Sequence, residues 1–136
     1  MKLELKHLAP YLPYGLKCEF NPMGLDNGKV IDEIKGIING KCHIGSGGRY
    51  GYFHREFKSI KPILRPLIDL DKNNEVLDFL YSECEGIDEN IDYWCEFKGN
   101  IINTSISFRA AQILFKNYFD VFGLIEKGLA IDINTI

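Results

Sequence analysis

The dipeptide Asn39-Gly40 constrains the fold of this chain more than any other pair of residues. Asn39 ends an apolar, β-branched run at 29–39, and Gly40 precedes a short alternation of apolar and polar residues at 41–44. Asn-Gly is the preferred dipeptide of a two-residue type I′ hairpin, because both of its residues adopt a positive φ readily. We therefore predict two antiparallel strands joined at this dipeptide, with another strand at 17–20.

Helical periodicity replaces this pattern in two later segments. Apolar side chains recur three and four residues apart over about 73–85, behind two asparagines that can cap a helix. Aromatic side chains recur at the same spacing over about 107–122, with Ser107 as the expected N-cap and Gly123 as the expected end. The sequence therefore predicts an α+β fold, with an antiparallel β-sheet and two main helices in a single compact domain over residues 1–136.

Two pairs of prolines limit the remaining segments. Pro10 and Pro13 exclude a long helix, so the front of the chain is expected to be a packed arm, with a polyproline ligand for an SH3-like groove as the alternative. Pro62 and Pro66 exclude a helix interior and predict an extended connector. Strand-like runs predict further strands at 91–97, 101–106 and 129–133.

Length and composition indicate a globular, soluble protein. A chain of 136 residues can bury roughly 65–70% of its unfolded surface, which suits one domain. Its nine phenylalanines and seven tyrosines argue against disorder. No apolar run reaches the ~18 residues that a bilayer span needs. The cysteines at 18, 42, 84 and 95 form no CxxC pair, which predicts free thiols in a cytoplasmic setting and no membrane contact.

Charge is distributed unevenly along a chain whose net charge is −3. Residues 45–66 carry five basic residues against one acid, a net +4. This segment mixes arginines with aromatic residues, and such surfaces grip phosphates while they stack unpaired bases. In the competing interpretation the aromatic side chains belong to the core of a hairpin, which the negative net charge favours. The candidate RNA-binding residues are Arg49, Tyr50, Tyr52, Arg55 and Lys58.

Residues 67–96 have the opposite character, with ten acids against one lysine, a net −9. A row of carboxylates can be complementary to a basic cleft on a partner protein and can speed the association. The competing interpretation is the solvated face of one helix and its loop. The candidate partner-binding residues on this acidic face are Glu75, Asp78, Glu85, Asp88 and Glu89.

No pattern of catalytic or metal-binding residues is recognisable. Cys42, His43 and His54, with Cys18 or Cys84, lack the closely spaced ligand pairs that zinc sites use. The chain also lacks GxSxG, HExxH and P-loop motifs. We therefore expect no metal, no cofactor and no catalytic residues. A small nuclease or hydrolase built on scattered Cys, His and Asp residues is the alternative.

Three segments, residues 3–16, 60–70 and 107–136, resemble a family of small uncharacterised proteins from phages and prophages of Bacteroidetes. The resemblance covers 55 of the 136 residues and is densest in the C-terminal run DVFGLIEKGLAIDINT. It implies a phage or mobile-element origin and action in the cytosol of a bacterial host. It carries over no catalytic residues.

These observations predict a phage-encoded, non-enzymatic binding protein that inhibits or redirects a host nucleic-acid-handling machine. An anti-CRISPR protein that binds an RNA-guided effector, or its guide RNA, is the most concrete version. The alternative is a phage structural or assembly protein, whose aromatic C-terminal helix packs against copies of itself to form a homo-oligomer.

Overall fold

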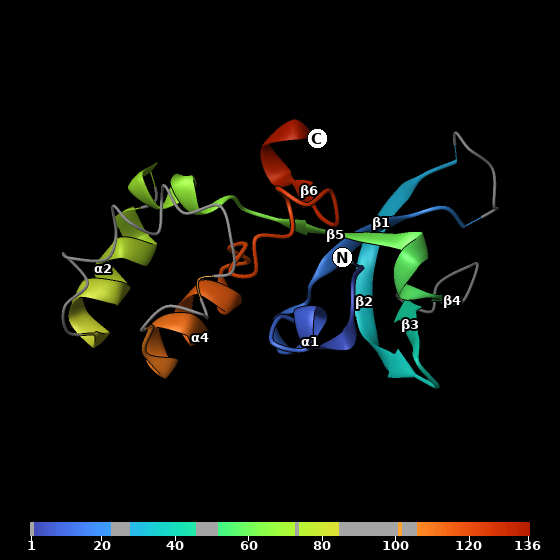
Figure 1. The fold of residues 1–136 in the computed structure, drawn as a ribbon, viewed down its shortest axis with the longest axis horizontal. Helices are drawn as coiled ribbons and strands as arrows, with labels where there is room; N and C mark the ends of the chain where they lie inside the picture. Colours follow the sequence, from blue (N-terminus) through green and yellow to red (C-terminus); the bar gives the residue numbers. More distant parts are fainter. Residues whose placement is uncertain (1, 23–27, 46–51, 73, 85–100, 102–105) are drawn as a thin grey trace. The chain divides into compact units, whose positions relative to one another are not determined.

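The structure is a computed structural model (Figure 1). Contacts divide the chain into two compact units. Unit 1 comprises Met1–Ile63 and Leu129–Ile131, and unit 2 comprises Leu64–Gly128 and Asp132–Ile136. The single domain predicted over residues 1–136 therefore stays a prediction, which cooperative unfolding would test. The residues that the structure describes are 2–22, 28–45, 52–72, 74–84, 101 and 106–136.

A six-stranded sheet in the order β4-β3-β2-β1-β5-β6 forms the framework of unit 1 (Figure 1). Its pairs β1–β2, β1–β5, β2–β3 and β3–β4 are all antiparallel. Together with the helices of unit 2, this sheet confirms the predicted α+β class. The strands are β1 (Lys17–Phe20), β2 (Val30–Ile38), β3 (Lys41–Ile44), β4 (Phe53–Arg55), β5 (Ile60–Leu64) and β6 (Ile131–Asp132).

The predicted hairpin turn is confirmed at Asn39 and Gly40. Their φ angles are 52° and 75°, so both residues have the positive φ that a type I′ turn requires. The turn leaves Ile38 opposite Lys41. Strands β1 and β3 have the bounds predicted from the sequence, and β2 is one residue shorter at each end than predicted.

The predicted extended conformation around Pro62 is confirmed, but these residues form strand β5 of the sheet and not a connector outside it. Pro62 lies opposite Cys18, and Lys61 lies opposite Glu19. A strand tolerates proline at a position where the neighbouring strand does not need a backbone N–H donor, which proline lacks. The neighbour on the other side, β6, is only two residues long. The prolines excluded a helix, as expected, but they did not exclude a strand.

The front of the chain is a packed arm, as predicted. It holds the short helix α1 (Leu5–Leu8) and the 3-10 turn η1 (Leu12–Tyr14). Tyr11, between the two prolines, is fully buried, so this arm is not a free polyproline ligand. A second 3-10 turn, η2 (Phe57–Ser59), leads into β5. The fully buried side chains of unit 1 include Leu8, Tyr11, Leu16, Cys18, Ile34, Cys42 and Ile44.

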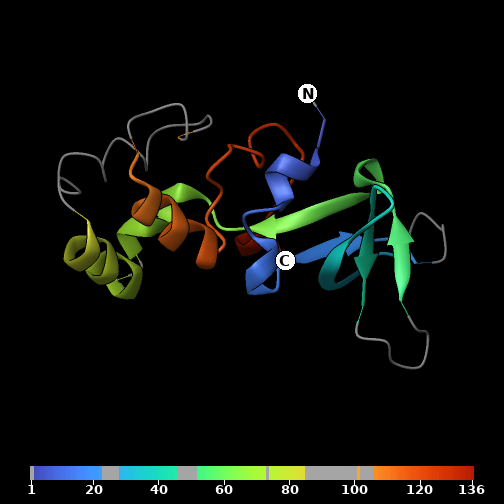
Figure 2. The ribbon, with the colours of Figure 1, turned by 90° about the horizontal axis from the view of Figure 1, so that it is seen from below.

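Two helices, α2 (Asn74–Glu83) and α4 (Phe108–Lys116), lie side by side in unit 2 (Figures 1 and 2). The 3-10 turns η3 (Leu67–Lys72) and η5 (Ile133–Thr135) complete the described elements of this unit. In the described part of the chain, no helix has the length and apolar character that a bilayer span needs. The core of unit 2 is formed by Leu67, Leu70, Val76, Leu80, Ile101, Ala110, Ile113, Leu114, Phe119 and Val121.

Helix α4 begins where the sequence predicts and ends earlier. The Oγ of Ser107 accepts the N–H of Ala110 at 3.1 Å, which confirms Ser107 as the N-cap. The predicted end near residue 122 was wrong, since the helix stops at Lys116. Tyr118 takes a left-handed φ of 64°, a conformation that terminates helices. No glycine or proline marks this stop in the sequence, and Phe119 remains buried beyond it.

Helix α2 lies within the predicted range of 73–85. Its predicted cap Asn73 and the glycine at 86 lie outside the described residues, as does most of the second hairpin predicted over 91–106. The closing strand predicted over 129–133 is shortened to Ile131–Asp132, which continues directly into η5.

Polar residues of the C-terminal segment hold its turns. The buried carboxylate of Asp120 accepts the N–H groups of Leu124 at 2.8 Å and Ile125 at 2.9 Å. Burial raises the pKa of Asp120, while these backbone hydrogen bonds act in the opposite direction. Farther along, the side-chain amide of Asn134 donates to the carboxylate of Asp69 at 2.7 Å. The C-terminal segment therefore contributes to the scaffold of unit 2.

Candidate nucleic-acid interface

Three aromatic rings lie on one face of the sheet, one on β3, one on β4 and one at the residue that precedes β4. Cys42 and Ile44 are buried, and side chains alternate between the two faces along a strand. His43 therefore lies on the opposite, outer face. His54 on β4 is its direct cross-strand partner. Tyr52, two residues before His54, lies on the same side and contacts His43.

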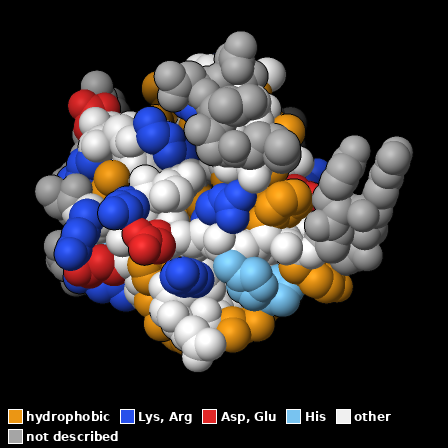
Figure 3. Space-filling model, turned by 90° about the vertical axis from the view of Figure 1, so that its right-hand side faces the viewer, with side chains coloured by type: hydrophobic (Ala, Val, Ile, Leu, Met, Phe, Trp, Pro, Cys, Tyr) orange, Lys and Arg blue, Asp and Glu red, His pale blue; other side chains and the backbone are white. Residues whose placement is uncertain are grey.

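These three side chains, Tyr52, His43 and His54, form a continuous row that we term the ring row. The centroid of the His43 ring lies 4.4 Å from that of Tyr52 and 4.7 Å from that of His54, both in edge-to-face geometry. Tyr52 is 49% exposed and His54 is also exposed. Figure 3 shows this side of the chain, with histidine side chains beside Lys, Arg and hydrophobic ones. The row thus offers aromatic surface to solvent.

The ring of His43 is only partly accessible. Its Nδ1 atom is buried and has no hydrogen-bond partner among the residues that the structure describes. A buried nitrogen without a partner costs about 1–3 kcal/mol. His43 therefore contributes the face and edge of its ring to the surface and does not offer this nitrogen to a ligand.

Arg55 has a positioning role next to the ring row. Its guanidinium donates to the backbone carbonyls of Pro22 at 2.8 Å and Asn21 at 3.4 Å, and to that of His54 at 2.8 Å. It also lies 5.4 Å from the centroid of the Phe53 ring. These contacts fasten β4 to the chain that follows β1. Arg55 was predicted as an RNA contact, but backbone carbonyls occupy most of its donors.

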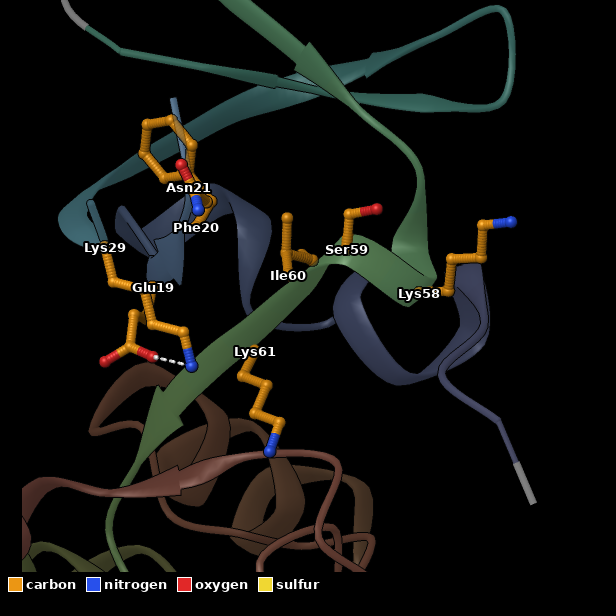
Figure 4. A pocket seen from close by; sticks show the side chains of 8 residues that line it. All are labelled: Glu19, Phe20, Asn21, Lys29, Lys58, Ser59, Ile60 and Lys61. Carbon is orange, nitrogen blue, oxygen red and sulfur yellow. Dashed lines mark ion pairs between the residues drawn. The ribbon is translucent and has the colours of Figure 1, made fainter. Parts of the chain in front are cut away.

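Lys58 lies at a hollow of about 180 Å³ where β1 ends and β5 begins. Lys29 and Lys61 line the same hollow (Figure 4). Lys29 pairs with Glu19 at 3.7 Å, and the side chains of Lys58 and Lys61 point away from each other. The three ammonium groups therefore do not converge on one anion. Lys58 also pairs with Glu56 at 3.3 Å, so two of the three ammonium groups on this basic rim already have carboxylate partners.

The other predicted site residues are only partly described. Arg49 and Tyr50 of the RNA-binding set lie outside the described residues. On the acidic face, Glu75 and Asp78 are exposed on α2. The remaining members of that set, Glu85, Asp88 and Glu89, are likewise outside the described residues.

The two units carry net charges of opposite sign. Unit 1 holds ten basic and six acidic residues, a net +4, and unit 2 holds six basic and thirteen acidic residues, a net −7. The basic candidate residues belong to unit 1 and the acidic ones to unit 2. Nucleic acid is therefore electrostatically matched to unit 1, although the whole chain is acidic.

His43 was not predicted as an RNA-binding residue. The sequence could have placed His43, because the Asn39-Gly40 turn sets the register in which β3 pairs with β2. Side chains alternate along β3, so His43 lies on the face away from the buried Cys42 and Ile44. The sequence does not predict the register of β4, which brings His54 and Tyr52 to the same face of the sheet as His43.

The buried thiols of unit 1 are poor ligands and nucleophiles. Burial raises the pKa of Cys18 to about 12 and that of Cys42 to about 11. Only the thiolate binds metals or attacks electrophiles. Cys42 also faces away from His43 and His54, so the metal set considered from the sequence is not assembled. Within the described ranges, no three His, Cys, Asp or Glu side chains group as a metal site.

Comparison with protein-family models, with curated proteins and with solved structures found no match. The resemblance to phage proteins therefore stays a prediction from the sequence.

Proposed function

We propose that this chain is a non-enzymatic binding protein that contacts single-stranded RNA within a host nucleic-acid-handling machine. The ring row carries the proposal, because half-exposed aromatic side chains on a sheet are the surface on which unpaired bases stack. The +4 charge of unit 1 supports it. The finer version, inhibition of an RNA-guided defence effector through its guide RNA during phage infection, rests on the sequence resemblance.

A pair of matched tyrosine variants tests the RNA contact. Tyr52 in unit 1 and Tyr81 in unit 2 are both 49% exposed, so truncation removes similar surface from each. Stacking of one base contributes about 1–3 kcal/mol, so Tyr52→Ala should weaken binding of a labelled, unstructured RNA roughly 5- to 150-fold in fluorescence anisotropy. Tyr81→Ala should bind like the wild type. Equal losses in both variants, or no binding by the wild type, would refute the proposal.

Charge reversal separates the two candidate faces. Lys58→Glu with Lys61→Glu removes basic side chains from the rim of unit 1, and should weaken RNA binding about tenfold and flatten its salt dependence. Glu75→Lys with Asp78→Lys reverses two exposed acids of unit 2 and should leave RNA binding unweakened. If instead the acidic pair is needed to capture the host machine from lysate, and nuclease treatment does not release it, the partner is a basic protein surface.

One observation favours the alternative of an assembly protein. Phe108, the first residue of α4, is 84% exposed, and exposed aromatic residues are common in association surfaces. A self-associating protein should sediment as an oligomer at micromolar concentration, and Phe108→Ser should shift it toward monomer. A wild type that sediments as a monomer at every concentration removes this alternative.

A further inference from the structure

Gly36 leaves the sheet surface beside the ring row bare. The β2–β3 pair shifts register between Ile34 and Gly36, and Gly36 lies opposite His43. A Cβ atom built on Gly36 meets nothing within 4 Å among the described atoms. Gly36 is not among the residues with positive φ, so its backbone conformation does not require glycine. The glycine therefore leaves open space next to the His43 ring, and a positive φ is not the reason for it.

Aromatic rings border this space on one side. The rings of Tyr52 and His54 flank His43, while the bare backbone of β2 lies on its other side. Lys35, at the register shift, pairs with Glu33. The pKa of Lys35 is raised chiefly by this hydrogen bond and to a smaller extent by interaction with Tyr52. The ammonium group of Lys35 is thus already paired with the carboxylate of Glu33.

We propose that the surface bounded by Gly36, His43 and Tyr52 is the stacking site for one unpaired base of single-stranded RNA. This inference rests on the proposed function and specifies where the base lies. A glycine allows a flat ligand to approach the backbone closely, and aromatic stacking accepts any base because every base has a π-face. The site should therefore tolerate different sequences.

Adenosine monophosphate is a probe that tests the site independently of RNA affinity. In NMR spectra of the full chain, a stacked adenine should shift the ring protons of His43 and His54 through its ring current. Ribose phosphate, which lacks the base, should leave them unchanged. Equal shifts with both compounds, or none with adenosine monophosphate, would overturn the inference.

Two phenylalanine variants on β2 locate the base. Gly36→Phe fills the open space, and Ile31→Phe places the same ring at a position that is already 45% exposed. Gly36→Phe should abolish the histidine shifts and weaken RNA binding about tenfold, whereas Ile31→Phe should retain both. If the wild type binds RNA but Gly36→Phe binds it equally well, this inference fails and the proposed function stands. If the wild type binds no RNA in anisotropy, the proposed function fails.

If Gly36→Phe does not fold, His43→Ala replaces it as the variant. This truncation removes the central ring, and the shift of His54 with adenosine monophosphate should disappear. A full shift of His54 in His43→Ala would overturn the inference.

Discussion

The two units differ in net charge and in the elements that carry their exposed aromatic side chains. Unit 1 has a net charge of +4 and exposes a row of rings on a sheet, while unit 2 has a net charge of −7 and exposes Phe79, Tyr81 and Phe108 on its helices. Both units also bury aromatic side chains, such as Tyr11 in unit 1 and Phe119 in unit 2. In unit 2, Asp120 and Asn134 hold turns. The segment on which the predicted resemblance rests thus holds the fold of unit 2, whereas the proposed RNA surface lies on the β3–β4 pair, which carries no sequence motif.

Thiol reactivity gives the largest expected difference between the units. With pKa values of about 12 and about 11, Cys18 and Cys42 should react with iodoacetamide about a thousandfold more slowly than a free cysteine at pH 8. Cys84 in unit 2 is only half-buried and should be labelled first among these three. Peptide mass spectrometry over time measures each site. Rapid labelling of Cys18 in the native chain would show that the inner face of the sheet is open to solvent.

A core truncation in unit 2 tests whether the units fold together. Leu80 is fully buried, so Leu80→Ala should lower the free energy of unfolding by about 2–5 kcal/mol. If residues 1–136 form one cooperative domain, the helical circular dichroism and the His43 and His54 ring signals should disappear at the same, lowered urea concentration. Histidine signals that keep the wild-type midpoint would instead identify two independently folding domains.

The scaffold role of the C-terminal segment predicts a smaller effect at Asp120. Asp120→Ala leaves the N–H groups of Leu124 and Ile125 without their acceptor and should cost about 1–3 kcal/mol. RNA binding by the folded variant should be unchanged. A loss of RNA binding at a temperature where this variant is still folded would place the segment in the binding surface after all.

The pH dependence of Asp120 follows from its raised pKa. The native state binds this proton more tightly than the unfolded chain does, so the contribution to stability is complete below the unfolded pKa of about 3.9 and is lost as the pH rises through the native value. Asp120→Asn cannot titrate. The stability of the wild type relative to Asp120→Asn should therefore fall as the pH rises from about 4, as urea titrations would measure. A difference that increases with pH would contradict the burial effect.

Local chemistry made part of this fold predictable. The Asn39-Gly40 turn and the Ser107 cap each act within a few residues, so the sequence was sufficient to predict them. The end of α4 was not predictable, because Tyr118 adopts a left-handed conformation that its residue type does not favour. Its neighbour Phe119 is packed in the core of unit 2, and such tertiary packing overrides local preference.

The candidate site depended on pairing between distant segments. From the sequence, Tyr52 and Arg55 were equivalent members of one basic, aromatic run. The structure separates them, since the guanidinium of Arg55 is occupied by the carbonyls of Asn21 and Pro22 and Tyr52 is left half-exposed. His43 joins Tyr52 only because β3 and β4 pair in one register.

The sequence by itself determined the α+β class, the positions of four of the strands, the cap of α4 and the opposing charges along the chain. These depend on hydrophobic period, turn chemistry and composition, which are local properties. Only the tertiary structure decided which aromatic rings share a face and that the Arg55 guanidinium is hydrogen-bonded to backbone carbonyls. It also decided that open space lies at Gly36, opposite His43. Those features depend on strand register, and a shift of one residue would turn every side chain of the strand to the other face.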